Sequence, residues 1–146
     1  MIDESGTAYA VVAFGEAGAA AAAKWIERLR ELGRPLWAWH GPPGADDGPA
    51  ALAGQVRGAR VGWRLLVAGP EADVLRARAV AIDGGAVPAE VTAVVTDDRW
   101  RRVWCPHCGA TTPTDGPSVR CSGCGRALVV GHHLSRRRAA YLGSLA

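Results

Sequence analysis

Short apolar runs alternate with helical patterns along the first two thirds of the chain. The runs have the length and composition of strands that are buried on both faces of a parallel sheet. The segments between them carry apolar side chains at helical spacing, and the first of these ends at Gly33, a typical residue after a helix. Strands that alternate with helices over short links predict a parallel sheet with right-handed crossovers. The predicted strands cover residues 9–14, 35–40, 63–68 and 91–95. The predicted helices cover residues 19–32, 49–57 and 71–84.

The pattern changes in the last third of the chain, where shorter elements and turns replace the alternation. We therefore expect two domains, an α/β domain over residues 1–98 and a smaller domain over residues 99–146. The predicted elements of the second domain are a hairpin arm over 99–104, a short strand over 127–130 and a short C-terminal helix within 132–146 that Ser135 caps.

All four cysteines of the chain lie in the second domain, as two C-x-x-C pairs with twelve residues between them. This spacing can place four thiolates at the corners of a tetrahedron, the geometry of a structural zinc site. Gly109 and Gly125 follow the pairs and allow tight turns that direct backbone N–H groups to sulfur. The pattern predicts a zinc ribbon with one structural zinc ion, and a single iron, as in rubredoxin-type centres, is the alternative. The predicted ligands are Cys105, Cys108, Cys121 and Cys124.

Charge is distributed unevenly along this chain of net charge +3. Residues 1–98 carry nine basic and thirteen acidic side chains, whereas residues 99–146 carry eight arginines and only Asp115 as an acid. A basic module of this kind can face nucleic acid or an acidic protein surface. Aromatic side chains other than Trp100 and Trp104 do not interleave with the arginines, so nucleic acid is not the expected partner. The residues predicted to bind an anion or a partner are His132, His133, Ser135, Arg136, Arg137, Arg138 and Tyr141, and a solvated basic end of the chain is the alternative.

A second candidate site is the turn between the first predicted strand and the first predicted helix, where the phosphates of a dinucleotide would rest on helix N–H groups. Gly15 and Gly18 stand there in G-x-x-G spacing, and Glu16 between them would repel phosphate. Gly69 and Pro70 follow the third predicted strand. Gly15, Gly18, Gly69 and Pro70 are therefore the candidate residues of a degenerate cofactor site. A plain turn without a ligand is the alternative.

The segment from Leu66 to Glu90 resembles the C-terminal half of the NAD(P)-binding module in the ferredoxin reductase superfamily. In that family a strand ends in Cys-Gly-Pro, a helix follows, and a G-V-P-x-E-x-I turn leads to the last strand. The corresponding residues here are Ala68-Gly-Pro and Gly85-Ala-Val-Pro-Ala-Glu90. The resemblance implies a small ferredoxin-reductase-like α/β fold. It also implies a degenerate module, because alanine replaces the cysteine that contributes to hydride transfer in that family.

The order of the parts resembles the small A-type subunit of bacterial dimethylamine monooxygenase. The segment H-H-L-S-R-R-R-A-A-Y-L-G at residues 132–143 and the ribbon pattern C-P-x-C-G … C-x-x-C-G-R-x-L-x-V carry this resemblance. That family works in a multi-subunit, NAD(P)H-dependent complex that demethylates secondary amines oxidatively. The resemblance implies an accessory subunit that docks on sister subunits through its ribbon and tail, with haem, flavin and iron–sulfur groups on the sister subunits only.

No serine, cysteine or lysine of the sequence has a neighbouring base that would indicate nucleophilic catalysis, so no catalytic residue is predicted. The leading hypothesis is a non-catalytic subunit of an oxidoreductase complex. A rubredoxin-like electron-transfer subunit and a basic zinc-ribbon protein that binds nucleic acid are the alternatives. No apolar run approaches the roughly 20 residues that span a bilayer, and no signal-peptide pattern begins the chain, so we expect a cytoplasmic protein without membrane contact.

Overall fold

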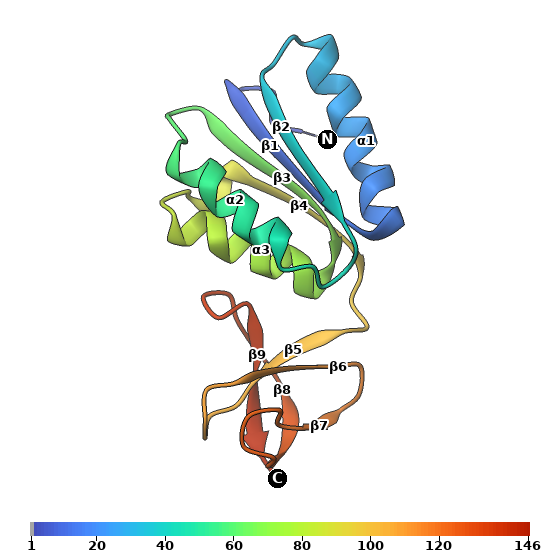
Figure 1. Ribbon diagram of the computed structural model, residues 1–146, viewed down its shortest axis with the longest axis vertical. Coiled ribbons are helices and arrows are strands. Elements are labelled where there is room, and N and C mark those ends of the chain that lie inside the picture. Colours follow the sequence, from blue (N-terminus) through green and yellow to red (C-terminus); the bar gives the residue numbers. More distant parts are fainter. Residues whose placement is uncertain (1) are drawn as a thin grey trace.

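Two β-sheets follow one another along the chain in the computed structural model, which describes residues 2–146 (Figure 1). The first sheet has four strands with helices packed on both of its faces, and the second has five strands. The C-terminus lies at the end of the molecule that is far from the first sheet (Figure 1). None of the helices within the described residues is both long and apolar enough to cross a bilayer.

The first sheet is parallel throughout, as the sequence predicted. Its strands and helices are β1 (Ala8–Phe14), α1 (Gly15–Glu31), β2 (Leu36–Gly41), α2 (Asp47–Arg57), β3 (Trp63–Pro70), α3 (Glu71–Asp83), a 3₁₀ turn η1 (Pro88–Glu90) and β4 (Val91–Asp97). The strand order is β2-β1-β3-β4. Val11 of β1 pairs with Ala38 of β2 on one side and with Leu66 of β3 on the other. Every strand and helix predicted for this part of the chain is present. The start of the first helix was predicted wrongly, because α1 begins at Gly15 and not at residue 19, so that residues 15–18 form its first turn.

Helices cover both faces of the parallel sheet, with α1 on one face and α2 and α3 on the other (Figure 1). Helix α1 packs Ala22, Trp25 and Leu29 against the sheet at the predicted helical spacing. On the opposite face, Trp37 and Trp39 of β2 pack against the core beside α2 and α3. Because both faces are covered, β1 and β3 are buried along nearly their whole length, which explains their continuous apolar runs.

The second sheet places its last strand in the middle. Its strands are β5 (Arg101–Trp104), β6 (Thr111–Thr114), β7 (Ser118–Arg120), β8 (Ala127–Ser135) and β9 (Ala140–Leu145). The strand order is β6-β5-β9-β8-β7, and β9 runs parallel to β5 and antiparallel to β8. A small buried cluster of Val103, Cys105, Cys121 and Leu128 forms the core of this sheet. Two of its four members are cysteines, so few aliphatic side chains are buried in this sheet.

The predicted C-terminal helix is wrong, because residues 132–146 belong to a β-hairpin. Strand β8 extends to Ser135, a turn follows, and β9 returns beside it. Pairing on both edges satisfies the backbone groups of β9, whereas a helix here would leave the facing edges of β5 and β8 unpaired. Three arginines in a first helical turn would also oppose the helix dipole. Ser135, predicted as the helix N-cap, instead accepts a hydrogen bond at 3.3 Å from the Arg138 N–H within the hairpin turn.

The second sheet meets the first at the carboxyl ends of the parallel strands, and residues 98–100 link the two (Figure 1). The Tyr141 hydroxyl donates a hydrogen bond to Glu71 Oε1, 2.5 Å away at the start of α3. The Arg101 guanidinium lies over the Tyr141 ring, 5.2 Å from its centre. These contacts join β9 to the N-terminal end of α3, and a cleft lies between the two sheets.

Candidate functional site

The structure brings the four predicted metal ligands together. Their Sγ atoms lie within 4.8 Å of one another, and all four thiols are free of disulfide bonds. The Sγ atoms of Cys105 and Cys124 are 3.8 Å apart, and those of Cys108 and Cys121 are 3.5 Å apart. Cys105 and Cys121 are buried in the core of the second sheet, whereas Cys108 is exposed. The cluster is therefore both part of the core of this sheet and accessible from solvent.

Both C-x-x-C pairs adopt the same backbone turn between two strands. The N–H of Cys105 donates to the Ala110 carbonyl at 2.9 Å, and the N–H of Cys121 donates to the Arg126 carbonyl at 2.8 Å. The glycine after each pair then donates its N–H to the carbonyl of the first cysteine, again at 2.9 Å in both turns. Gly109 and Gly125 have φ values of +80° and +75°, a conformation that favours glycine. The repeated turn explains why a glycine follows each pair in the sequence.

A tetrahedral metal ion with four thiolate ligands fits this cluster. Metal–sulfur bonds of about 2.3 Å place the sulfur atoms about 3.8 Å apart, close to the separations of 3.8 and 3.5 Å found here. Backbone N–H groups of Cys124 and Gly123 lower the pKa of the Cys121 thiol to about 6. The Gly123 N–H lies 3.3 Å from this sulfur. The pKa of the neighbouring Cys108 thiol rises to about 11 despite the Ala110 N–H, because the other three sulfurs surround it. Since all four corners would be protein ligands, the arrangement is that of a closed structural site.

The three arginines of the tail are not equivalent in the structure. Arg138 lies over the Trp104 ring, 4.1 Å from its centre, so its charge is engaged within the chain. Arg136 and Arg137 are exposed in the hairpin turn and form no ion pair within residues 2–146. The three arginines could not be told apart in the sequence, because they are consecutive and identical. Only the fold brings Arg138 onto Trp104 of β5. The hairpin turn therefore carries two exposed guanidinium groups without an ion pair within residues 2–146.

His132 and His133 lie in an irregular part of β8, outside the cysteine cluster. Val130 pairs with Gly143 and Leu134 pairs with Tyr141, so three residues of β8 face the single residue between them on β9. A Cβ atom on Gly131 would lie 2.4 Å from the Leu142 carbonyl oxygen, which explains the glycine at the start of this bulge. Both imidazoles are exposed. The bulge therefore presents them to solvent beside the arginine turn.

Close packing accounts for two of the four residues that the sequence proposed for a cofactor. A Cβ atom on Gly18 would lie 2.7 Å from the Ala68 carbonyl oxygen, and one on Gly69 would lie 2.8 Å from Phe14 Cβ. Gly15 has a φ of +75° at the start of α1. Among the four, only Pro70 lines the cleft between the sheets. Gly18 and Gly69 thus allow α1, β1 and β3 to approach one another closely. Binding of a nucleotide at the start of α1 stays a prediction.

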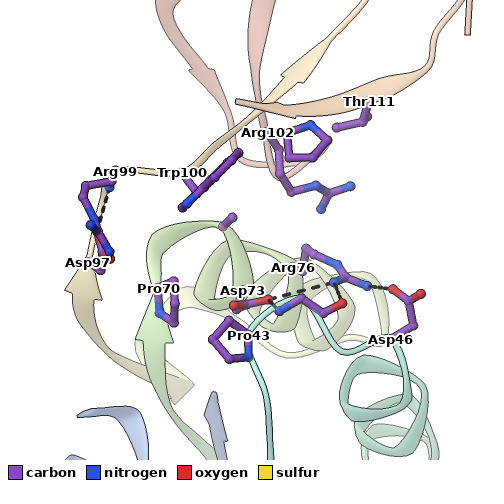
Figure 2. Close-up of a pocket in the computed structure, with 13 residues that line it drawn as sticks. Pro43, Asp46, Pro70, Asp73, Arg76, Asp97, Arg99, Trp100, Arg102 and Thr111 are labelled. Atoms are coloured by element: carbon purple, nitrogen blue, oxygen red, sulfur yellow. Dashed lines mark hydrogen bonds and ion pairs between the residues drawn. The ribbon is translucent and has the colours of Figure 1, made fainter. Parts of the chain in front are cut away.

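Sequence reasoning did not find the cleft between the two sheets, because its walls come from segments far apart in the chain (Figure 2). The cleft has a volume of about 590 Å³. The α/β part contributes Pro70, Asp73 and Arg76, and the second sheet contributes Arg102 across from them. Trp100, in the link between the sheets, lines the cleft and is 48% exposed. The cleft lies outside the carboxyl ends of parallel strands, the usual position of ligand sites in open α/β sheets.

Most charged groups of the cleft are paired. Asp46 forms an ion pair with Arg76 at an N···O distance of 2.6 Å, and Asp97 forms one with Arg99 at 2.8 Å (Figure 2). The buried Asp73 carboxylate accepts a hydrogen bond at 3.0 Å from the Gly44 N–H and lies 4.0 Å from Arg76. Burial raises the pKa of Asp73 despite this hydrogen bond.

A known family and a known protein are similar to this chain, the first to the segment that forms the second sheet and the second to about two thirds of the chain. Residues 102–144 match the family model of the dimethylamine monooxygenase subunit DmmA-like C-terminal domain. The heme-dependent oxidative N-demethylase delta subunit of Ectopseudomonas mendocina (strain ymp) is 35% identical over 102 residues. This match covers 69% of the present chain and 58% of that relative, so the chain matches somewhat more than half of the relative's length. No solved structure matches the chain. The two matches confirm the resemblance of this chain to the small dimethylamine monooxygenase subunit.

Proposed function

We propose that this chain is an accessory, non-catalytic subunit of an oxidative N-demethylase complex that acts on dimethylamine and uses NAD(P)H. The match of residues 102–144 to the DmmA-like C-terminal domain carries the proposal. The 35% identical relative is itself called a delta subunit of an oxidative N-demethylase, which supports a place among sister subunits. In this proposal the sister subunits hold the haem, flavin and iron–sulfur groups. The parallel sheet is a ferredoxin-reductase-like module that has lost its role in hydride transfer.

The proposed contact surface is the hairpin turn with the bulge beside it, defined by His132, His133, Arg136 and Arg137. All four side chains are exposed, and they lie in the matched domain. Two contacts connect the hairpin to the rest of the chain. Arg138 packs on the Trp104 ring, and the Tyr141 hydroxyl donates a hydrogen bond to Glu71. A cationic surface of this kind favours a partner surface that is rich in carboxylates.

We further propose that the four cysteines hold one structural zinc ion. A closed set of four thiolates is the commonest structural zinc site, and the two turns suit it. Protein purified without metal-chelating resin is expected to contain one zinc per chain by elemental analysis and to lack visible absorption. One iron per chain with thiolate charge-transfer bands would contradict this assignment and would make the chain a rubredoxin-like electron carrier.

Double substitution of Arg136 and Arg137 by glutamine is expected to reduce co-purification of sister subunits from the native host at least roughly tenfold. Charged contacts that become buried at an interface are worth this much or more. The matched control is Arg126→Gln, which removes an exposed arginine that lies immediately before β8 of the same sheet, outside the hairpin turn, and forms no ion pair within residues 2–146. We expect that variant to retain its partners. Equal losses in both variants would show that the hairpin turn is not the contact surface, and a wild-type chain that purifies alone would contradict the proposed function itself.

A further inference from the structure

We propose that the cleft between the two sheets binds a small oxyanion, a phosphate or carboxylate group of a low-molecular-weight ligand, on the guanidinium of Arg102. This site is separate from the cysteine cluster and from the hairpin turn. The inference does not depend on the proposed function, because it rests on the charges and walls of the cleft alone.

Arg102 is a half-buried cation whose guanidinium makes no direct contact with a carboxylate. It lies on β5, three residues before the first cysteine, and its side chain points into the cleft (Figure 2). No ion pair or hydrogen bond from its guanidinium is present within residues 2–146. Burial lowers the pKa of Arg102 and the nearby Arg76 acts in the same direction, against the weaker attraction of Asp73 and Asp46. Removing a charge from water without pairing it is costly, so this position favours an anion that the chain itself does not supply.

The carboxylates nearby are committed to other partners. Asp46 is paired with Arg76, and Asp97 is bound by Arg99 through its side chain and its backbone N–H. Asp73 is 4% exposed and accepts a hydrogen bond from the loop at Gly44. Within the described part of the chain, Arg102 is therefore the one guanidinium of the cleft that is left without a carboxylate. A planar guanidinium fork matches the two oxygens of a carboxylate or phosphate group.

The shape of the cleft limits the size and character of the ligand. A volume of about 590 Å³ suits a small molecule, since ligand sites typically measure about 300–1,000 Å³. Pro70, Trp100 and Pro113 supply apolar surface beside Arg102. Trp100 and the two prolines favour a ligand whose anionic group is attached to a flat, apolar body. Because the walls come from both sheets, a bound ligand would also join them.

Isothermal titration calorimetry on the full, metal-loaded chain with phenyl phosphate and with benzoate tests this site. The two probes share an aromatic ring and differ in their oxyanion, so they separate a phosphate site from a carboxylate site. We expect saturable binding of at least one probe with a Kd of about 1 mM or below. We expect Arg102→Gln to weaken it roughly tenfold or more, because a charge-assisted hydrogen bond is lost.

Arg60→Gln is the matched control, because Arg60 lies outside this cleft and has no ion pair within residues 2–146. It should bind the probes as the wild-type chain does. Metal content and circular dichroism establish that Arg102→Gln is folded, and Arg102→Lys, which keeps the charge but loses the fork, should bind with intermediate affinity. Absence of binding by both probes, or equal affinity of the wild-type chain and Arg102→Gln, would overturn the proposal.

Discussion

Cys108→Ser is expected to abolish metal binding and to unfold the second sheet while the parallel sheet remains folded. The Cys108 sulfur lies 3.5 Å from that of Cys121, so its replacement opens one corner of the cluster. The second sheet spans fewer than 50 residues and its buried cluster contains only two residues that are not cysteines, Val103 and Leu128. A module of this size depends on its metal, whose binding supplies about 10–16 kcal/mol in small zinc peptides at neutral pH.

Elemental analysis and thermal unfolding followed by circular dichroism measure this effect. The matched control is His107→Ala, which changes the neighbouring side chain inside the same C-x-x-C pair and leaves all four thiolates in place. We expect that control to keep one metal ion per chain and the wild-type unfolding curve. A full metal content in Cys108→Ser would show that three cysteines suffice or that another residue ligates the ion.

Gly69→Ala is expected to destabilise the parallel sheet by about 2–4 kcal/mol. Gly69 lies next to the last residue of β3 and has a φ of +156°, and an added Cβ atom would lie 2.8 Å from Phe14 Cβ and 3.1 Å from the Phe14 carbonyl oxygen. Both contacts involve the end of β1, which the sheet holds between β2 and β3, so neither atom can move away easily. The loss combines backbone strain with overpacking in a closely packed region.

Chemical denaturation monitored by tryptophan fluorescence measures the free energy of unfolding of this variant. Gly85→Ala is the matched control, because Gly85 also has a positive φ, +113°, but an added Cβ atom there would meet no atom within 4 Å. It should lose about 1 kcal/mol, the cost of the backbone conformation alone. If the two variants lose equal stability, the close approach of β1 and β3 does not explain Gly69, and a ligand at this turn becomes the better explanation.

The parallel sheet was predictable because its signals are local. A strand that is buried on both faces must be apolar throughout, and β1 and β3 are the two inner strands of the sheet. Helix α1 likewise shows its buried face as the spacing of Ala22, Trp25 and Leu29. The cysteine cluster was predictable for a similar reason, because each C-x-x-C pair forms its own local turn. One further pair is then enough to bring four sulfur atoms together.

The C-terminal segment could not be predicted from its own residues. Ser135 followed by three arginines allows a capped helix, and Ser135 does accept a hydrogen bond three residues ahead, yet β9 forms because β5 and β8 offer it two open edges. The same strand pairing decides that Arg138 reaches Trp104 while Arg136 and Arg137 stay free.

The sequence by itself thus determined the order of strands and helices in the first sheet, the cluster of four cysteines and the basic character of the tail, because each depends on local periodicity, spacing or composition. Only the tertiary structure decided the path of the tail and the composition of the cleft. Asp73 and Arg102 face the same cleft although they are far apart in the chain. Their proximity depends on how the second sheet rests against α3, through contacts such as Tyr141 with Glu71, and long-range packing of this kind leaves no local pattern in the sequence.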